Sequence, residues 1–368
     1  MTEAGYNVSV ICPAAAGQPF RDTVSGVEVF RYPPPRDGDG FVGYVWEYGY
    51  ALFWSFWLSL TVAMRSGFDV IHSHNPPDLF FLIAALYRPF GKRFVFDHHD
   101  LSPEMYLARF QDGGNALVHR VLLACEKLSF RLADLVVATN ESYRKIAIER
   151  GGVPAEKVAI VRNGPETERF HNAVPDEELR RRATTILGYV GVIGVQDGVD
   201  LLVRAVSHLV KNLGYEDVLA IVIGDGDALQ EVKQLTSDEG IESHFLFTGR
   251  IDDPAILLKY LATADICVDP DPFNAYNDRC TMIKMTEYMA VGKPIAAFDL
   301  TEHRVTAQDA AIYARPNDER DLALKIAELI GDPERRREMG RIGQDRIANG
   351  LSWPLQAPRL VEAYADLA

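Results

Sequence analysis

The sequence predicts an α/β fold in which two doubly wound parallel sheets form two domains. Short segments rich in β-branched residues alternate with helical stretches. A first series reads NVSVIC, FDVIHSH, RFVFDHH, DLVVAT and VAIVRNG, and a second reads TILGYVG, LAIVIGDG, HFLFTG, DICVDP and PIAAF. This alternation is typical of βαβ units with helices on both faces of each sheet. A chain of 368 residues, 48% of them hydrophobic, can bury a core in each of two domains.

The boundary between the domains is predicted at the turn dipeptide Asn163-Gly164, which separates the two series. The first domain is therefore expected over 1–164 and the second over 165–350. Residues 351–368 have apolar side chains at helical spacing, and we expect them to pack back on the first domain. Doubly wound sheets bind ligands beyond the carboxyl ends of their strands, so we expect a ligand cleft where the two domains face each other.

The charge and the cysteines exclude some classes of function. The net charge is −14, of which residues 1–163 carry −1 and the remainder −13. An acidic chain without clustered cations argues against a nucleic acid partner. The cysteines are far apart, without the spacing of a zinc site or a disulfide framework: Cys12, Cys125, Cys267 and Cys280. The start of the sequence lacks the features of a targeting signal, so we expect a cytoplasmic protein.

The segment 41–64 raises the question of a membrane. Residues 48–64 carry no charge over 17 positions, just under the length that spans a bilayer. A helix buried within the first domain is the favoured interpretation, and an interfacial helix and a membrane span are the alternatives. Because Trp46, Trp54 and Trp57 suit headgroup depth, we expect at most peripheral contact with the inner face of a membrane.

Three turns after strands of the second series could bind a ligand. GDGD (224–227) and GYVGVIGVQDG (188–198) resemble loops that bind anions through backbone N–H groups. GDGD is also explained as a tight strand-to-helix turn, since Leu229 replaces the third glycine of a dinucleotide fingerprint. Asp197, in the second loop, would repel a phosphate. DPDP (269–272) resembles the Asp-x-Asp of metal-dependent transferases, but its prolines favour a stiff turn.

Histidines follow two strands of the first series, in HSHNPPD (72–78) and DHHDLSPE (97–104). Imidazoles and carboxylates are zinc ligands, so a metal hydrolase is one interpretation. The favoured alternative is hydrogen bonding at the strand ends without a metal.

The segment NDRCTMIKMTEYMAVGKP (277–294) predicts an amphipathic helix that Asn277 or Asp278 would cap and that ends at Gly-Lys-Pro. Three methionines form one apolar stripe, expected in the core: Met282, Met285 and Met289. Lys284 and Glu287 lie one turn apart, which a surface ion pair would explain as well as a ligand site.

The order of these features resembles the family-4 retaining glycosyltransferases. Their GT-B fold has two Rossmann-like domains, and they need no metal for catalysis. The resemblance covers nearly the whole chain and runs through DVIHSHNPPD, VFDHHDLSPE, ADLVVATNES, VAIVRNG, GYVGVIGVQDGVDLLVRA, VIGDGD, FTGRI, ADICVDP, TEYMAVGKPIAAFD and SWPLQAPRLVEAYADL. It implies transfer of a sugar from a nucleoside-diphosphate sugar to a hydroxyl of a glycan or lipid-linked acceptor, in polysaccharide or glycoconjugate synthesis. The nucleotide sugar is a co-substrate, and no cofactor is implied.

The resemblance also implies roles for particular residues. Glu287 matches the second glutamate of the Glu-seven residues-Glu signature, which accepts hydrogen bonds from the donor ribose. His99 is implied beside the donor sugar, and Arg250 and Ile251 beside the nucleobase. The remaining implied donor-binding residues come from the glycine loop and from the loop that would hold the diphosphate: Gly194, Thr281 and Met282. The implied acceptor-side residues are His74, Asn75 and Asp100.

The sequence departs from the family pattern in three places. Arg279 replaces the first signature glutamate, and Asp197 replaces a basic residue of the second-domain loop. We therefore hypothesise that Lys284, with Arg279, supplies the positive charge that stabilises the departing diphosphate. The family's first strand and glycine-rich loop are not found, so we expect either a truncated start or a reduced first domain. A catalytically silent GT-B protein and a nucleotide-sugar epimerase stay open as alternatives.

Overall fold

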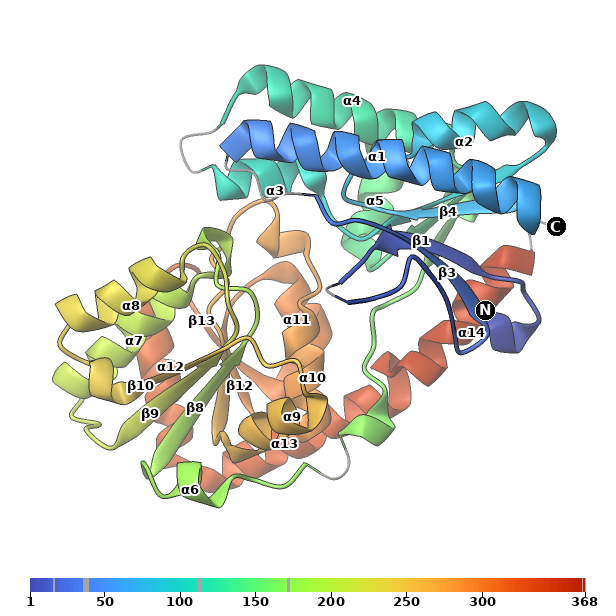
Figure 1. Ribbon diagram of the computed structural model, residues 1–368. Helices are drawn as coiled ribbons and strands as arrows, with labels where there is room; N and C mark the ends of the chain where they lie inside the picture. Colours follow the sequence, from blue (N-terminus) through green and yellow to red (C-terminus); the bar gives the residue numbers. More distant parts are fainter. Residues whose placement is uncertain (16, 36–39, 111–113, 171–172, 366, 368) are drawn as a thin grey trace. The chain divides into compact units, whose positions relative to one another are not determined.

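The computed structural model describes residues 1–15, 17–35, 40–110, 114–170, 173–365 and 367. It divides into two compact units (Figure 1). Unit 1 comprises Met1–Pro103, Asn115–Val161 and Pro358–Ala368, and unit 2 comprises Glu104–Gly114 and Arg162–Ala357. The main division therefore lies three residues before the boundary that the sequence suggests.

Unit 2 is built on a six-stranded sheet in which all strands are parallel. Its strands are β8 (Thr185–Val190), β9 (Val218–Ile223), β10 (Phe245–Gly249), β11 (Ile266–Asp269), β12 (Ile295–Phe298) and β13 (Ala311–Ala314). Their spatial order is β10-β9-β8-β11-β12-β13, the Rossmann order 3-2-1-4-5-6 counted within the unit. The order reverses between β8 and β11, and ligands of such sheets bind at this switch point.

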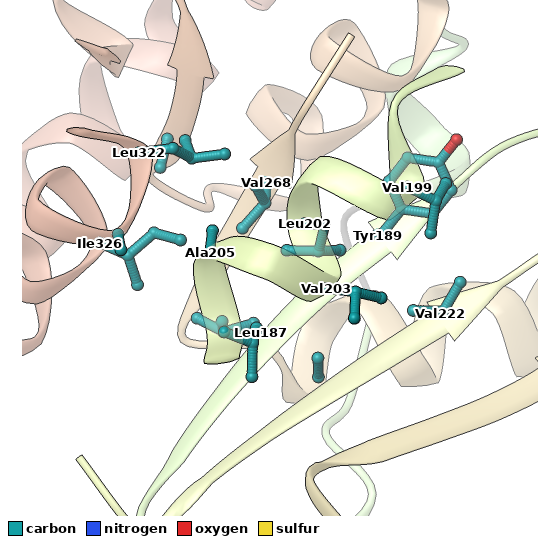
Figure 2. Close-up of a cluster of buried hydrophobic side chains, with 14 of the residues drawn as sticks. Leu187, Tyr189, Val199, Leu202, Val203, Ala205, Val222, Val268, Leu322 and Ile326 are labelled. Carbon is teal, nitrogen blue, oxygen red and sulfur yellow. The ribbon is translucent and has the colours of Figure 1, made fainter. Parts of the chain in front are cut away.

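The helices of unit 2 cover both faces of this sheet. They are α6 (Glu177–Arg180), α7 (Val199–Lys211), α8 (Leu229–Asp238), α9 (Pro254–Thr263), α10 (Ile283–Val291), α11 (Thr301–Ala307), α12 (Glu319–Gly331) and α13 (Pro333–Arg346). On one face α7, α8 and α12 bury a cluster that includes Leu187, Leu202 and Ile326 (Figure 2). On the other face, Met285 and Met289 of α10 are fully buried, as predicted, whereas Met282, the third methionine of the predicted stripe, is half-buried against the same cluster.

Unit 1 contains two sheets. One is parallel and has the order β4-β5-β6-β7, and the other has the order β1-β3-β2, with β3 parallel to β1 and antiparallel to β2. The strands are β1 (Ser9–Pro13), β2 (Arg21–Val24), β3 (Val27–Tyr32), β4 (Val70–His74), β5 (Arg93–His98), β6 (Leu135–Ala138) and β7 (Val158–Ile160). The β2–β3 hairpin was not expected from the sequence. Its turn, Ser25-Gly26, has φ angles of 49° and 82°, which tight hairpin turns require.

The helices of unit 1 surround these sheets. They are α1 (Gly40–Arg65), α2 (Phe81–Tyr87), α4 (Ala116–Leu132) and α5 (Glu141–Glu149), together with the first two residues of α3 (Ser102–Arg109). The division between the units falls within α3 and within the terminal helix α14 (Trp353–Ala365).

Helix α1 is buried on one side only. Leu58 and Val62 pack against Phe30 and Tyr32 of β3. The opposite side exposes about half or more of four large side chains: Trp46, Phe53, Trp57 and Met64. The prediction of a buried helix therefore holds for one side of α1. The side chains of residues 41, 42 and 44 are not among those that the structure describes. Among the described residues, no helix combines the length and the apolarity that crossing a bilayer would need.

Candidate functional site

Two glycine loops meet at the switch point of unit 2. Gly191 N donates to Ile223 O (3.0 Å) and Ile193 N donates to Asp225 O (3.0 Å). A Cβ atom on Gly224 would lie 1.8 Å from Gly191 O, so only glycine allows this close approach of the two backbones. The GDGD turn is therefore explained by packing against the β8 loop, as the structural alternative proposed.

The side chain of Asp197 forms hydrogen bonds within its own loop, which follows β8. Its Oδ2 accepts hydrogen bonds from Gly194 N (3.0 Å) and Gln196 Nε2 (3.1 Å). Burial raises the pKa of Asp197, and Lys284 partly offsets this effect. The aspartate that replaces the family's basic residue thus holds the loop in place.

A pocket of about 790 Å³ lies beside this loop, within unit 2. Gly194 and Val195 line it together with Asp200 and Arg204 of α7. Gly194 thus lines a pocket, and its role in donor binding stays a prediction. Glu287 is not among the described residues that line it.

The DPDP turn is the centre of a buried ionic cluster. Asp269 and Asp271 are at most 1% exposed. Lys284 Nζ lies 2.5 Å from Asp271 Oδ1 and 3.3 Å from Asp269 Oδ1, and His303 Nε2 lies 3.6 Å from Asp269 Oδ2. The ammonium of Lys284 thus pairs with both carboxylates of the turn, which favours the stiff, structural turn. Because Lys284 is 9% exposed and pairs with these aspartates, the alternative of a surface ion pair with Glu287 is wrong.

The pKa shifts describe how this cluster distributes its charge. Burial raises the pKa of Asp271, and the neighbouring Asp269 raises it further. Burial acts in the same direction on Asp269, but Lys284 and His303 outweigh it and lower the pKa of that carboxyl. Burial would lower the pKa of Lys284, yet the two aspartates raise it well above its usual value. Lys284 is therefore charged but not the free cation that the hypothesis assumed, and its contact with a diphosphate stays a prediction.

Helix α10 begins later than the sequence suggests. Its N-cap is Met282, and neither Asn277 nor Asp278 caps it. Asn277 Nδ2 instead donates to Gln196 O (2.9 Å) and Pro272 O (2.9 Å), which ties the loop after β8 to the loop after β11. Asp278 accepts a hydrogen bond from the first residue of α11. Asparagine and aspartate are typical helix caps, but here both side chains form hydrogen bonds with residues that are distant in the sequence.

Glu287 has the environment expected of a ligand-binding carboxylate. It lies on α10 and is partly buried. Burial raises its pKa, and Arg169 partly offsets this effect. No hydrogen bond to its carboxylate is found among the described residues, so the group can accept hydrogen bonds from a ligand.

The other residues predicted to bind the donor lie in two separate loops. Thr281 and Met282 immediately precede α10, and Arg279 Nη1 donates to Ala275 O (2.8 Å) in the same loop. Arg250 and Ile251 follow β10, at the edge of the sheet and two strands from β8. The side chain of Arg250 is exposed and pairs with Asp252 (Nε–Oδ1 2.7 Å).

In unit 1, three imidazoles surround the buried Asp97 at the ends of β4 and β5. Asp97 Oδ2 lies 2.9 Å from His72 Nε2 and 3.2 Å from His74 Nδ1, and Oδ1 lies 3.1 Å from His99 Nε2. Burial would raise the pKa of Asp97, but the imidazoles outweigh it and lower that pKa. Burial would lower the pKa of His99, and Asp97 and Asp100 reverse that effect and raise it.

Asn75 has a supporting role in this cluster. Its side chain is 4% exposed. Its Oδ1 accepts hydrogen bonds from His99 N (2.7 Å) and Asp100 N (3.1 Å), and its Nδ2 donates to Asp78 Oδ1 (2.9 Å) and Asp100 O (2.6 Å). Asn75 therefore holds the backbone of His99 and Asp100 from beneath the surface, and its acceptor-side role stays a prediction. The side chain of His74 is 65% exposed, and its acceptor-side role stays a prediction.

Sequence reasoning missed one residue of this cluster. The hydroxyl of Tyr364, on α14, is hydrogen-bonded to His72 Nδ1. The two residues are 292 positions apart, so no spacing in the sequence could have paired them.

Comparisons with known proteins agree with this fold. A family model described as a glycosyl transferase 4-like domain matches residues 1–164, and one described as glycosyl transferases group 1 matches residues 184–332. The D-inositol 3-phosphate glycosyltransferase of Thermobispora bispora is 25% identical over 317 residues, which cover 77% of this chain and 72% of the relative.

Two solved structures share the fold at low sequence identity. Sucrose-phosphate synthase from Thermosynechococcus elongatus has a TM-score of 0.77 and 18% identity, covering 100% of this chain and 90% of that one. HepE of Anabaena, in complex with UDP-glucose, has a TM-score of 0.67 and 17% identity, covering 93% and 86%. Since the two family models together span most of the chain and its neighbours have the same fold, the protein belongs to the family-4 glycosyltransferases of the GT-B type.

Proposed function

We propose that this glycosyltransferase is a retaining enzyme that transfers a sugar from a nucleoside-diphosphate sugar to a hydroxyl acceptor. The observation that carries the proposal is the switch point of unit 2. There the β8 loop and the loop before α10 are tied together through Asn277, and α10 presents a carboxylate, Glu287, without a described hydrogen-bond partner.

The donor is proposed to bind along these loops. Glu287 would accept hydrogen bonds from the ribose, Arg250 and Ile251 would hold the nucleobase, and the loop that contains Thr281 would hold the diphosphate. The N-terminus of α10 offers unpaired N–H groups and about half a positive charge to an anion. HepE, which shares the fold, was crystallised with UDP-glucose, so UDP-sugars are the first donors to test.

The proposed chemistry transfers the sugar on one face of the ring. The bond between the anomeric carbon and the diphosphate breaks, the acceptor oxygen forms the new bond, and its proton passes to the departing phosphate. The main task of the protein is to stabilise the charge that develops on the leaving group. His99 is proposed beside the donor sugar, and no metal is proposed at the diphosphate.

We also propose that the acceptor is a glycan or a lipid-linked molecule and that unit 1 contacts a membrane surface from one side. The side of α1 opposite Leu58 and Val62 exposes large apolar side chains, as described above. Helix α4 exposes Leu117, Val121 and Leu128, and its exposed charged residues are all basic: Arg120, Lys127 and Arg131. Basic and apolar side chains on one helix are typical of binding to anionic lipid.

The function is tested with the purified full chain. Thermal shifts with UDP-, GDP- and dTDP-sugars identify the donor, because a ligand at 100 times its Kd adds about 2.7 kcal/mol of stability. Turnover is then measured with glycan and lipid-linked acceptors, and NMR of the product determines the anomeric configuration. We expect retention, and EDTA should leave turnover within about twofold.

Each alternative gives a different result in these assays. A donor that binds but is never turned over indicates a silent GT-B protein, and an altered sugar formed without an acceptor indicates an epimerase. An inverted product contradicts retention. Loss of turnover in EDTA that manganese restores contradicts the proposal that no metal acts at the diphosphate.

A further inference from the structure

The cluster around Asp97 has the composition and the convergence of a metal site. His72 and His74 are two residues apart on β4, so their side chains point to the same face of the strand. Asp97 on β5 is in register with His74. One ligand atom from each of these three residues lies within 4.8 Å of the other two.

The distances fit a small cation. Zinc binds imidazole nitrogen and carboxylate oxygen at about 2.0–2.2 Å, so neighbouring ligand atoms of a tetrahedral site lie roughly 3.3 Å apart. The contacts of Asp97 Oδ2 with His72 Nε2 and His74 Nδ1 measure 2.9 and 3.2 Å. A small outward movement of the two rings would place a cation between the three atoms.

Hydrogen bonds alone do not satisfy the buried carboxylate. Asp97 Oδ1 is buried and lacks a hydrogen bond by the distance and angle of its contacts among the described residues, and it faces the imidazole of His99 at 3.1 Å (Nε2). A buried charge whose lone pairs are unmet is costly, and a divalent cation would compensate it.

The surroundings resemble the outer shell of a metal site. The second ring nitrogen of His72 is hydrogen-bonded to the hydroxyl of Tyr364, the kind of contact that fixes a ligating imidazole. His74 has an exposed side chain, so a solvent molecule could supply a fourth ligand. Three protein ligands and one exchangeable position are typical of open zinc sites.

We propose that His72, His74 and Asp97 bind one divalent transition-metal ion, with Zn²⁺ the best match to two imidazoles and a carboxylate. The ion joins the carboxyl ends of β4 and β5, and through His72 it also fixes Tyr364 of α14. The site goes beyond the proposed function, because the donor is proposed to bind unit 2 and no step of sugar transfer passes through this ion.

The test uses the full chain, stripped of metal by chelation and dialysis and then titrated with Co²⁺ and Zn²⁺. We expect each chain to bind one Co²⁺ ion with the visible absorption of a four-coordinate nitrogen and oxygen site. Zn²⁺ should displace the Co²⁺ ion, and binding of the metal should raise the Tm of the protein. His74→Ala, at an exposed position, should weaken Co²⁺ binding by at least 100-fold, whereas Tyr364→Phe should weaken it about 10–100-fold, as loss of an outer-shell contact does.

His119→Ala is the matched control, since His119 lies on α4 of the same unit, and its Co²⁺ affinity should equal that of the unmodified chain. No stoichiometric binding, or equal affinity in His74→Ala and His119→Ala, would overturn the proposal. A nucleotide thermal shift on the metal-free chain separates this result from the proposed function, because donor binding in unit 2 should persist without the ion.

Discussion

Lys284 and Asp271 form a buried ion pair, with 2.5 Å between Nζ and Oδ1. The pair joins the first turn of α10 to the loop after β11, one of the two strands at the switch point of unit 2. Asp269 lies 3.3 Å from the same ammonium, so the positive charge is already matched within the protein. The proposed diphosphate would therefore draw mainly on backbone N–H groups at the start of α10.

Replacing Lys284 should destabilise the protein. Lys284→Ala leaves Asp269 and Asp271 buried without a cation, and breaking a buried pair in this way costs about 3–5 kcal/mol of unfolding free energy. This differs from the effect expected of a free phosphate cation, which would lower turnover by about 10²–10³ with little change in folding. Urea unfolding followed by fluorescence measures the difference.

The control for this variant is Lys325→Ala. Lys325 pairs with Glu328 on the partly exposed surface of α12, so its loss should cost under about 1 kcal/mol. Adding Asp271→Asn to Lys284→Ala should restore part of the lost stability, because it removes one of the uncompensated carboxylates. A Lys284→Ala protein as stable as the control would show that the ion pair does not support the fold.

Glu287→Gln should weaken donor binding without destabilising the fold. A carboxylate is a stronger acceptor for ribose hydroxyls than an amide, and a hydrogen bond to a charged group contributes about 1.5–3 kcal/mol, so affinity should fall roughly 10–100-fold. Burial raises the pKa of Glu287, so donor affinity of the unmodified chain should also decline as pH falls through that raised value. Isothermal titration with the donor found in the screen checks both. Glu334→Gln, on the exposed surface of α13, is the control, and equal affinity in the two variants would remove Glu287 from the site.

Asp78 should make the stability of the protein depend on pH. Burial raises its pKa to about 6, and the nearby His98 and Glu126 act in opposite directions on it. The folded state therefore holds a proton that the unfolded state, with a pKa of about 3.9, releases earlier. Stability should fall as pH rises from about 4 to 6, by at most about 3 kcal/mol, and this contribution should be constant above that window.

Asp78→Asn tests this dependence, because the amide oxygen can still accept the hydrogen bond that Asn75 donates to Asp78 Oδ1. The variant should gain stability relative to the unmodified chain at pH 8 but not at pH 4, measured by urea unfolding at both values. A stability difference that does not change with pH would show that Asp78 is ionised throughout.

The exposed side of α1 should bind lipid vesicles. Trp46→Ser and Trp57→Ser together remove two half-exposed indoles, and at about 25 cal/mol per Å² of buried apolar area their loss should weaken vesicle binding about tenfold or more. Flotation with phosphatidylglycerol vesicles measures the bound fraction, and Leu324→Ser on α12 of unit 2 is the control. Binding that is equal in all three proteins, or absent from the unmodified chain, would contradict the peripheral contact.

The sequence predicted helices and strands well where burial imposes an apolar pattern. It predicted them poorly where residues are exposed or where polar contacts determine the start of an element. Five of the six strands of unit 2 are mostly or fully buried, β10 being the exception, and the sequence predicts all of the six except β13. Strand β2 was missed because most of its residues are exposed, which leaves no apolar alternation to detect. Helix α10 was predicted to start too early because Asn277 and Asp278, which look like caps, bind neighbouring loops.

The site was predictable only where the family pattern marks a residue. The family pattern marks Glu287, which lies on α10, and His99, which directly follows β5, and their contacts with a donor stay predictions. The partners of Lys284 were not foreseen, because Asp269 and Asp271 come from a different strand and loop, and charge pairing across a fold leaves no local pattern. The same reason hid the contact between His72 and Tyr364.

Asn75 supports His99, so its loss should lower turnover more than stability alone explains. Asn75→Ala removes the acceptor for two backbone donors, His99 N and Asp100 N, and each buried donor left unmet costs about 1–3 kcal/mol. The shift of His99 that follows should reduce turnover about 10²-fold, as a displacement of roughly 1 Å can. Donor affinity should change little, because the nucleotide of the donor is proposed to bind unit 2. The matched control is Asn115→Ala, which removes the exposed N-cap of α4 in the same unit and should cost about 1 kcal/mol with full turnover. If both variants lose stability and neither loses turnover once folded, then Asn75 only stabilises unit 1 and His99 does not act beside the donor sugar.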